Sequence, residues 1–313
     1  MHQPSRRSDR RTRAAPRAAR ADLYEDVTRR IIAQLEAGRV PWVRPWEAGG
    51  VAPGLPRNAL TGRPYSGINV LILWSAVAEN GWPSQAWLTF RQALAAGGSV
   101  RKGARGTCVV YADRFTPEAE AEKAQARGEE AKTIAFLKRF TVFNVEQCEG
   151  LRADLAPDPA PLADDEIVPH AEVVIAASGI DVRIGGSRAF YAPGEDFVQL
   201  PPRHAFRECV NFYSVALHEL THATGHKTRL DRQILNSFGS KDYAREELVA
   251  EMGSAFLCAA LGIAPTVRHA DYLGAWLDVL RADNRAIFRA ASAASKAADW
   301  LLARRADSEG GAV

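Results

Sequence analysis

Apolar residues recur at helical spacing soon after the chain begins. Leu23, Val27, Ile31 and Leu35 fall on one face of a helix, and Gly38 suits the C-terminal end of that helix. The same kind of spacing predicts two more helices, and runs of β-branched and aromatic residues predict a pair of strands. The helices are expected at residues 65–77 and 89–96, and the strands at residues 107–115 and 134–145. An α+β fold is therefore expected for this half of the chain.

The pattern of the second half predicts mostly helices after a few short strands. Strands are expected at residues 181–184, 189–191 and 197–200, where glycine and proline turns separate short apolar runs. Helices are expected at residues 171–178, 208–224, 244–261 and 272–305. We therefore expect a mainly helical second domain with a small antiparallel sheet, and an α+β fold for the chain as a whole.

Changes in composition divide the chain into segments. The start is rich in Arg, Ala and Pro and poor in apolar residues, and a Pro-rich stretch without periodicity lies near the middle. The predicted divisions are a disordered basic arm (1–21), a first domain (22–150), a linker (151–165), a second domain (166–305) and a flexible tail (306–313). The Glu/Ala/Lys-rich residues 116–133 are expected to form an excursion at the tip of the predicted hairpin.

The composition is that of an ordinary globular protein, so both domains can bury a core. No stretch of the sequence is long and apolar enough to predict a membrane span, and no apolar region of the kind found in secretory signals follows the first arginines. The cysteines are far apart and form no CxxC pair; they are Cys108, Cys148, Cys209 and Cys258. Reduced thiols in a cytoplasmic protein are therefore expected, with no contact to a membrane.

The net charge of +3 is unevenly distributed along the chain. Residues 1–21 carry seven arginines and one aspartate, a net charge of +6. Residues 22–150 hold 16 basic and 14 acidic side chains, a net charge of +2, whereas residues 151–313 hold 17 basic and 22 acidic ones, a net charge of −5. A polyanion would therefore be attracted to the front of the chain rather than to its second half.

The segment His218-Glu219-Leu220-Thr221-His222 indicates a metal site. Residues four apart lie on one face of a helix, so the imidazoles of His218 and His222 can bind one zinc ion. Glu219 then lies beside the water that the ion polarises and can act as a general base. The pentapeptide also occurs by chance, but here an apolar, helix-compatible run precedes it and Gly225 ends the helix, which favours a metal site.

A zincin site needs a third ligand, and the next predicted helix offers acidic residues for it. Glu247 and Glu251 are four residues apart and precede an apolar face, where a carboxylate is costly to bury without a metal or a partner. We expect Glu247 to bind the metal and Glu251 to accept a hydrogen bond from a metal-bound histidine, with the reverse assignment as the alternative. His226 is a weaker candidate because Gly225 interrupts the helix, and Glu246 fits an exposed acidic residue at a helix start.

Tyr243 lies just before the acidic helix. Its hydroxyl is a candidate donor to the oxyanion of a tetrahedral intermediate, although packing is the simpler explanation for a tyrosine at this position. Zn²⁺ is the expected cofactor, and a site of two histidines and a carboxylate also accepts Mn²⁺ or another divalent ion.

Basic residues gather at two places in the first half. One cluster is a compact turn in which glycines would let backbone N–H groups approach phosphates. The candidates for DNA contact are Arg101, Lys102 and Arg105 in this turn and Arg57, Arg63 and Tyr65 in the second cluster. Tryptophans in the same half, among them Trp42, offer faces for base stacking, although Trp74 and Trp87 also suit a core and the basic turn also suits a solvated hairpin. We expect binding of single-stranded DNA without a readable sequence preference.

Several separate segments, in the same order, resemble the ArdC family of antirestriction proteins. In the second half they are FVQLPP, FYSVALHELTHATGHKTRLDR and YAREELVAEMGSAFLCAALGI. In the first half they are PWVRPW, RNALTGRPYSGINVLIL, WLTFRQA, VRKGARGT and FTVFNVEQ. The resemblance implies an N-terminal single-stranded-DNA-binding domain, shared with TraC-type plasmid primases, and a C-terminal zincin-like metallopeptidase domain.

The family protects incoming plasmid DNA from restriction during conjugation, so the resemblance implies that function here. His218, Glu219 and His222 match the metal motif of the family, and Glu247 and Glu251 match its second segment. The alternative is a zinc endopeptidase, recruited by DNA, whose main role is cleavage of a protein substrate. The intact Glu219 argues against a third hypothesis, a purely structural metal site, because such a site needs no general base.

Overall fold

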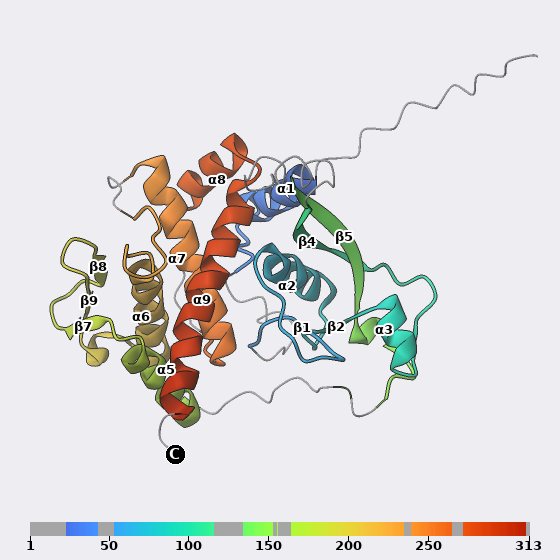
Figure 1. Ribbon diagram of the computed structural model, residues 1–313, viewed down its shortest axis with the longest axis horizontal. Helices are drawn as coiled ribbons and strands as arrows, with labels where there is room; N and C mark the ends of the chain where they lie inside the picture. The colour runs from blue at the N-terminus through green and yellow to red at the C-terminus, as the bar shows by residue number, and fades with distance from the viewer. Residues whose placement is uncertain are drawn as a thin grey trace, which may run out of the picture.

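The computed structural model describes residues 23–42, 53–115, 134–152, 155, 164–234, 239–264 and 272–310. Helices of the second half stand at one side of the molecule, and the larger sheet of the first half lies at the other (Figure 1). The predicted basic arm at residues 1–21 and the predicted excursion at residues 116–133 lie outside the described residues.

The first half is α+β, as predicted. Its described helices are α1 (Leu23–Glu36), α2 (Ile68–Asn80) and α3 (Phe90–Ala95). The main sheet has the strand order β1 (Arg57–Asn58), β2 (Ala86–Thr89), β5 (Ile134–Asn144) and β4 (Thr107–Phe115). In this sheet β1 and β2 are parallel and the other pairs are antiparallel. β3 (Ser99–Val100) and β6 (Cys148–Glu149) form a separate antiparallel ribbon, and the short 3-10 helix η1 (Val145–Gln147) connects β5 to β6.

The predicted strand pair is confirmed, with a register that runs from Thr107 opposite Val142 to Phe115 opposite Ile134. β4 is an edge strand, and one side chain of α2 covers part of that edge. The amide of Asn69 donates to the carbonyl oxygen of Val110 at 2.7 Å and accepts from its N–H at 2.8 Å. These hydrogen bonds occupy backbone groups that an exposed edge would offer to another strand.

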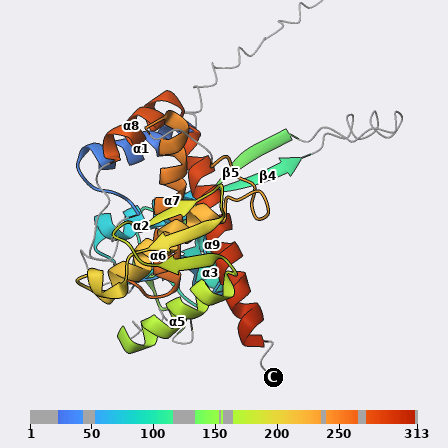
Figure 2. The same cartoon turned by 90° about the vertical axis from the view of Figure 1, so that its left-hand side faces the viewer.

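The second half begins with α5 (Asp164–Ala177) and a small sheet of β7 (Asp181–Ile184), β9 (Phe197–Leu200) and β8 (Phe190–Ala192). The sheet was expected to be antiparallel, but it is mixed, because β7 pairs with β9 in parallel and only β8 runs antiparallel to β9. After η2 (Arg203–Ala205) the chain forms α6 (Cys209–Ala223), α7 (Lys241–Ala260), α8 (Leu273–Ala282) and α9 (Ala286–Gly310). Figure 2 shows the small sheet on the side of the molecule where α6 lies.

Element boundaries differ from the predicted ones where no apolar period marks them. α5 begins at Asp164, inside the segment predicted as a linker. The single predicted stretch at 272–305 is two helices, since Asp283 has an extended backbone between α8 and α9. α9 continues to Gly310, into the segment predicted as a tail.

Aromatic side chains join the two halves in one apolar core. The rings of Trp42 and Trp276 lie 5.5 Å apart edge to face, and those of Trp74 on α2 and Phe256 on α7 lie 5.7 Å apart. Each of these side chains is at most 1% exposed. Because Trp42 is buried, its ring is not available for the base stacking expected of it. Trp87 is fully buried as well, so Trp74 and Trp87 are core residues.

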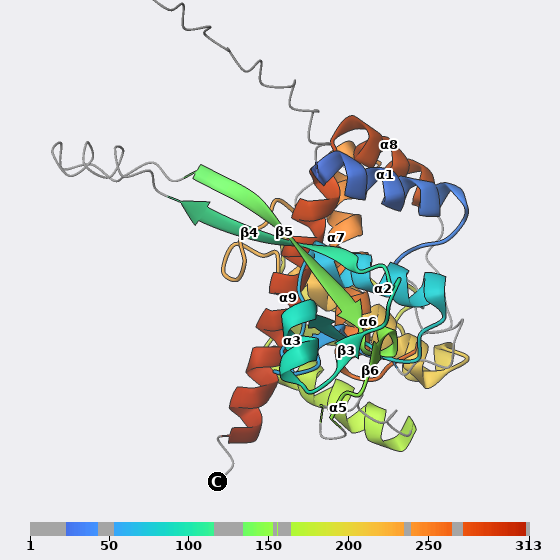
Figure 3. The same ribbon diagram turned by 90° about the vertical axis from the view of Figure 1, so that its right-hand side faces the viewer.

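The contact between the halves is visible from another side in Figure 3, where α1 lies beside α8. The hydroxyl of Thr28 on α1 donates to the carbonyl oxygen of Asn284, between α8 and α9, at 2.7 Å. Among the described residues, no helix combines the length and the apolar character needed to cross a membrane.

A shared core predicts that damage on one side destabilises the whole molecule. Phe256→Ala removes a ring that is 1% exposed, and we expect the free energy of unfolding to fall by about 3–5 kcal/mol. The measurement is denaturant unfolding followed by tryptophan fluorescence. Phe140→Ala, at a side chain that is 47% exposed, is the control and should change the free energy by less than about 1 kcal/mol. Equal effects of the two substitutions would contradict a core that continues from α2 to α7.

Candidate metal centre

Helices α6 and α7 cross closely, and the crossing decides where their side chains meet. At Gly253 of α7 a Cβ atom would lie 2.4 Å from Cγ2 of Thr221 and 2.8 Å from its Oγ1. The hydroxyl of Thr221 donates to the carbonyl oxygen of Leu217 at 2.7 Å, which holds this side chain against α6. Only glycine fits at this point of α7 without moving the helices apart.

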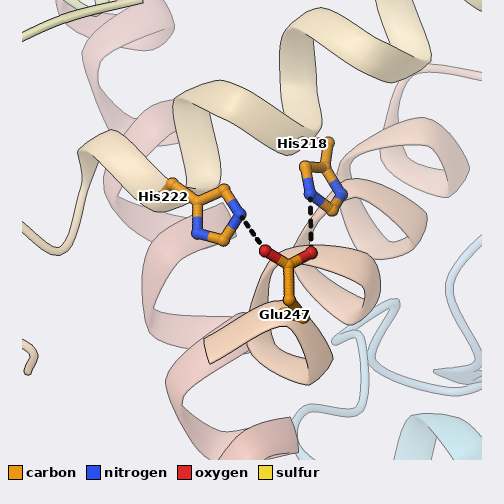
Figure 4. A group of neighbouring side chains, drawn as sticks. All are labelled: His218, His222 and Glu247. Atoms are coloured by element: carbon orange, nitrogen blue, oxygen red, sulfur yellow. Dashed lines mark ion pairs between the residues drawn. The ribbon is translucent and has the colours of Figure 1, made fainter. Parts of the chain in front are cut away.

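The crossing brings together the three residues predicted to bind a metal. Nε2 of His218 lies 3.6 Å from Oε2 of Glu247, and Nε2 of His222 lies 3.5 Å from Oε1 of the same carboxylate. One ligand atom from each residue falls within 4.8 Å of the other two. Figure 4 shows the two imidazoles on one face of α6, directed toward the carboxylate on α7. Two imidazole nitrogens and one carboxylate form a donor set that suits Zn²⁺ and other divalent ions.

Each histidine also faces a second carboxylate with its other ring nitrogen. Nδ1 of His218 lies 3.5 Å from Oε1 of Glu251, the residue predicted to support a ligand. Nδ1 of His222 lies 3.3 Å from Oε1 of Glu246. Carboxylates in these positions fix the orientation of a metal-binding imidazole and raise its basicity.

The expectation that Glu246 is an exposed residue at a helix start is wrong, because its side chain is buried. The helix begins earlier than predicted, at Lys241, after Ser240, whose side-chain oxygen accepts from the N–H of Tyr243 at 3.1 Å. Glu246 therefore lies beyond the first turn, where the helix dipole no longer explains a carboxylate.

Arg232, in the loop after α6, compensates the charge of Glu246. Its Nε and Nη2 atoms donate to the two carboxylate oxygens at 3.2 and 2.8 Å. The remaining bonds tie the guanidinium to α6, through Nη1 to Oγ1 of Thr224 at 2.8 Å and through Nη2 to the carbonyl oxygen of Thr221 at 2.6 Å. No motif indicated Arg232 or Glu246, although both lie in segments that carry the family resemblance.

The charges of the site strongly perturb one another. Burial lowers the pKa of His222, but Glu246 and Glu247 outweigh it and raise this pKa to about 10. Burial likewise lowers the pKa of His218, while Glu247 and Glu251 raise it more. Burial raises the pKa of Glu247, but its hydrogen bonds to both histidines bring it well below the usual range. Binding of a metal at these nitrogens therefore requires them to release protons.

The three residues line a cleft of about 540 Å³, as does Glu219. Tyr243 and Tyr272 line the same cleft, with their hydroxyl oxygens 3.3 Å apart. Burial, Tyr272 and Glu247 together raise the pKa of Tyr243, so its hydroxyl keeps its proton at neutral pH. A general base and a phenol donor are therefore available beside the candidate metal ligands.

One wall of the cleft is tied to the end of α6. Tyr191 of β8 lines the cleft, and its hydroxyl donates to Oδ1 of Asp196 at 2.8 Å. Arg229, which follows α6, forms an ion pair with Asp196 and donates through Nε to the carbonyl oxygen of Ala223 at 2.7 Å. The small sheet is thereby held beside the histidine helix.

The candidate DNA-binding residues occupy two separate turns of the first half. Arg101, Lys102 and Arg105 are exposed between β3 and β4, where Gly103 has a φ of +86°. Gln147 braces this turn, because its carbonyl oxygen accepts from the N–H of Arg101 at 2.9 Å and its Nε2 donates to the carbonyl oxygen of Arg105 at 2.9 Å.

In the second turn, Arg63 is exposed, Tyr65 is half-buried and Arg57 is buried with 9% of its surface exposed. Burial and a hydrogen bond to Asn58 act in opposite directions on the pKa of Tyr65, and burial prevails and raises it. The exposed basic residues can approach a polyanion. Arg57 lies in β1, paired with β2, and little of its side chain reaches the surface.

Comparisons with known proteins agree on both halves. Residues 21–143 match the N-terminal domain of the anti-restriction factor ArdC, and residues 169–293 match a zincin-like metallopeptidase domain. Two crystal structures of the antirestriction ArdC protein from plasmid R388, one metal-free and one with Mn(II) bound, are 41% identical to this chain. They align with TM-scores of 0.76 and 0.75 and cover 91% of this chain and 98% and 99% of theirs.

Related sequences extend over nearly the same region. The uncharacterized protein y4eC of Sinorhizobium fredii is 42% identical over 293 residues, which are 92% of this chain and 94% of y4eC. The DNA primase TraC of Escherichia coli is 41% identical over 299 residues, 90% of this chain but 27% of TraC. The chain therefore belongs to the ArdC family of antirestriction proteins and carries a zincin-like domain in its second half.

Proposed function

We propose that this chain binds single-stranded DNA with its first half, protects incoming plasmid DNA from restriction during conjugation, and holds a divalent metal ion in its zincin-like half. The observation that carries the metal site is the meeting of His218, His222 and Glu247 within 4.8 Å at the cleft. The Mn(II)-bound structure of the R388 protein supports a divalent ion in this family. Zn²⁺ and Mn²⁺ both suit the donor set.

The residues of the cleft are those that peptide hydrolysis requires. A divalent ion bound there would supply a Lewis acid and lower the pKa of water. Glu219 would accept the proton of the attacking water and return it to the leaving amine. Tyr243, protonated because its pKa is raised, would donate a hydrogen bond to the oxygen of the attacked carbonyl. Glu246 and Glu251 would hold the two imidazoles in place.

The DNA-binding part of the proposal rests on the exposed basic turn at Arg101, Lys102 and Arg105, and on the match to the ArdC N-terminal domain. Arginine donates paired hydrogen bonds to phosphate, and the left-handed backbone of Gly103 keeps the turn compact. Since the tryptophans of this half that the structure describes are buried or partly buried, phosphate contacts rather than tryptophan stacking would supply most of the affinity.

A second candidate function is cleavage of a protein substrate as the main role, with DNA serving to recruit the enzyme. The presence of Glu219 and Tyr243 in one cleft beside the metal ligands favours it. The two candidates differ in whether protection depends on the general base.

Substitution of the acidic residues on α7 shows which of them binds the metal and which only orients a histidine. Glu247→Ala should abolish binding of one equivalent of Zn²⁺ or Mn²⁺, as should His218→Ala, because each removes a ligand. Glu251→Gln and Glu246→Gln should weaken binding by about 10- to 100-fold, because each only loosens an imidazole. Calorimetric titration with each metal measures both effects. Retention of metal by Glu247→Ala together with its loss in Glu251→Ala would reverse the assignment.

The variant Glu219→Gln separates protection from proteolysis. It removes the general base while keeping the shape of the side chain, so we expect metal content, affinity for single-stranded DNA and protection of plasmid DNA to stay close to those of the parent chain. The measurement is conjugation efficiency into restricting and non-restricting hosts. Loss of protection at unchanged DNA affinity would instead support the endopeptidase.

The basic turn is tested by Arg101→Ala combined with Arg105→Ala. Loss of two phosphate contacts should weaken binding of an oligothymidylate and lower the slope of log affinity against log salt by about 1.4, since each contact to a single strand contributes about 0.7. Fluorescence anisotropy over a range of salt concentrations measures both.

The matched control, Arg188→Ala with Arg207→Ala, removes two exposed arginines in the loops before β8 and α6. It lowers the net charge equally and should leave the slope near that of the parent chain. An identical slope in both variants would remove the turn from the DNA interface.

A further inference from the structure

A second pocket, of about 630 Å³, lies between α1 and the zincin-like half, and none of its lining residues lines the metal cleft. It lies where α1, the start of α9 and the loop after α6 meet. Its lining is unusually basic; the charged residues in it are Arg232, Arg285, Arg289 and Lys296. The volume is within the range of pockets that hold small molecules, about 300–1,000 Å³.

The cations of this pocket are not all compensated by the fold. Arg232 is paired with Glu246, and Arg289 with Asp283. Neither Arg285 nor Lys296 forms an ion pair with a carboxylate among the residues that the structure describes. Two positive charges are therefore available to a ligand.

Arg285, directly before α9, and Arg289, in its first turn, stand where a helix disfavours positive charge. Arg285, Arg289, Ser292 and Lys296 follow at intervals of four, three and four, so they lie along one face. Arg285 and Arg289 are four residues apart and repel each other, and both oppose the dipole at the N-terminus of α9, where Asp283 compensates only Arg289 by an ion pair. An anion bound beside Arg285 would relieve both effects.

An aromatic floor holds one of the free cations in place. The ring of Tyr24 on α1 lies 4.7 Å from that of Phe288 on α9, and the guanidinium of Arg285 lies 4.8 Å above Tyr24. A guanidinium stacked on a ring still presents its N–H groups at its edge, where they can form paired hydrogen bonds with phosphate oxygens.

The pocket adjoins the half of the chain to which DNA binding is assigned. α1, which carries Tyr24, also contacts the main sheet, because Asp26 lies 3.6 Å from Nη2 of Arg139 on β5. In Figure 1 and Figure 3, α1 lies near both β5 and the upper part of α9. A strand held by the first half can therefore continue over α1 to the pocket.

We propose that this pocket, through Arg285 and Lys296, binds phosphates in the backbone of single-stranded DNA. The inference rests on the proposed function of the first half and adds a contact on the second half, whose net charge of −5 would otherwise disfavour DNA. A small phosphate compound would be recognised by the same cations as a DNA phosphate, so the test below distinguishes these two ligands.

The test uses the full chain with Arg285→Ala and Lys296→Ala combined. Both side chains are exposed, so the variant is expected to fold. Anisotropy titration with an oligothymidylate should give affinity about 10-fold below that of the parent chain and a salt slope lower by about 1.4. The Arg188→Ala and Arg207→Ala pair again serves as the charge-matched control and should leave both quantities nearly unchanged.

Each outcome decides between the proposals. If the parent chain binds the oligothymidylate and the pocket variant binds it as tightly as the control does, the pocket assignment is overturned while DNA binding stands. If the parent chain does not bind single strands at all, the proposed function itself fails. Calorimetric titration with pyrophosphate tests the small ligand. If the pocket variant no longer binds pyrophosphate but binds the oligothymidylate as the parent chain does, the pocket binds a small phosphate compound and the proposed contact with DNA is overturned.

Discussion

Three carboxylates buried close together on α7 constrain the zincin-like half more than any other feature. Glu246, Glu247 and Glu251 are each less than 9% exposed, and an isolated buried carboxylate costs several kcal/mol. The fold gives each of them positively charged or donating neighbours, which are the imidazoles of His218 and His222 and the guanidinium of Arg232. Removal of one partner leaves a buried charge uncompensated, so the metal site and the stability of the helix pair depend on the same contacts.

Several neighbouring segments hold α6 and α7 at the distance that these contacts require. Gly253 lets α7 approach α6 until the carboxylates reach the imidazoles. The loop after α6 then returns to the site with Arg232, and Arg229 in the same loop binds Asp196 next to the small sheet. The cleft wall, the histidine helix and the acidic helix are thus fixed by one set of polar contacts, and the proposed hydrolysis would need such a fixed geometry.

The sequence predicted the meeting of the candidate metal ligands because their spacing maps directly onto helix geometry. His218 and His222 are four apart, as are Glu247 and Glu251, and periodicity of that kind survives any error in the helix ends. Glu246 was misjudged because its environment depends on where α7 begins and on a loop residue, Arg232, and neither is encoded in a local period. The same reason applies to Trp42, since its burial depends on Trp276, more than two hundred residues later in the sequence. The parallel pairing of β7 with β9 also reflects tertiary packing, which alternation along a strand does not specify.

Arg232 stands between the metal centre and the basic pocket, and its hydrogen bonds show how the two are kept apart. Four N–H groups of its guanidinium donate to Glu246, Thr221 and Thr224, all on the side of α6 and α7. A guanidinium has five such groups, so Arg232 has little left to offer a ligand in the pocket. Its charge is also offset by Glu246. The attraction for an anion therefore comes from Arg285 and Lys296, which form no ion pair with the candidate metal ligands in the described part of the chain. Because the pocket cations and the metal ligands are different side chains, phosphate binding can be removed by substitution without disturbing the residues that orient the imidazoles.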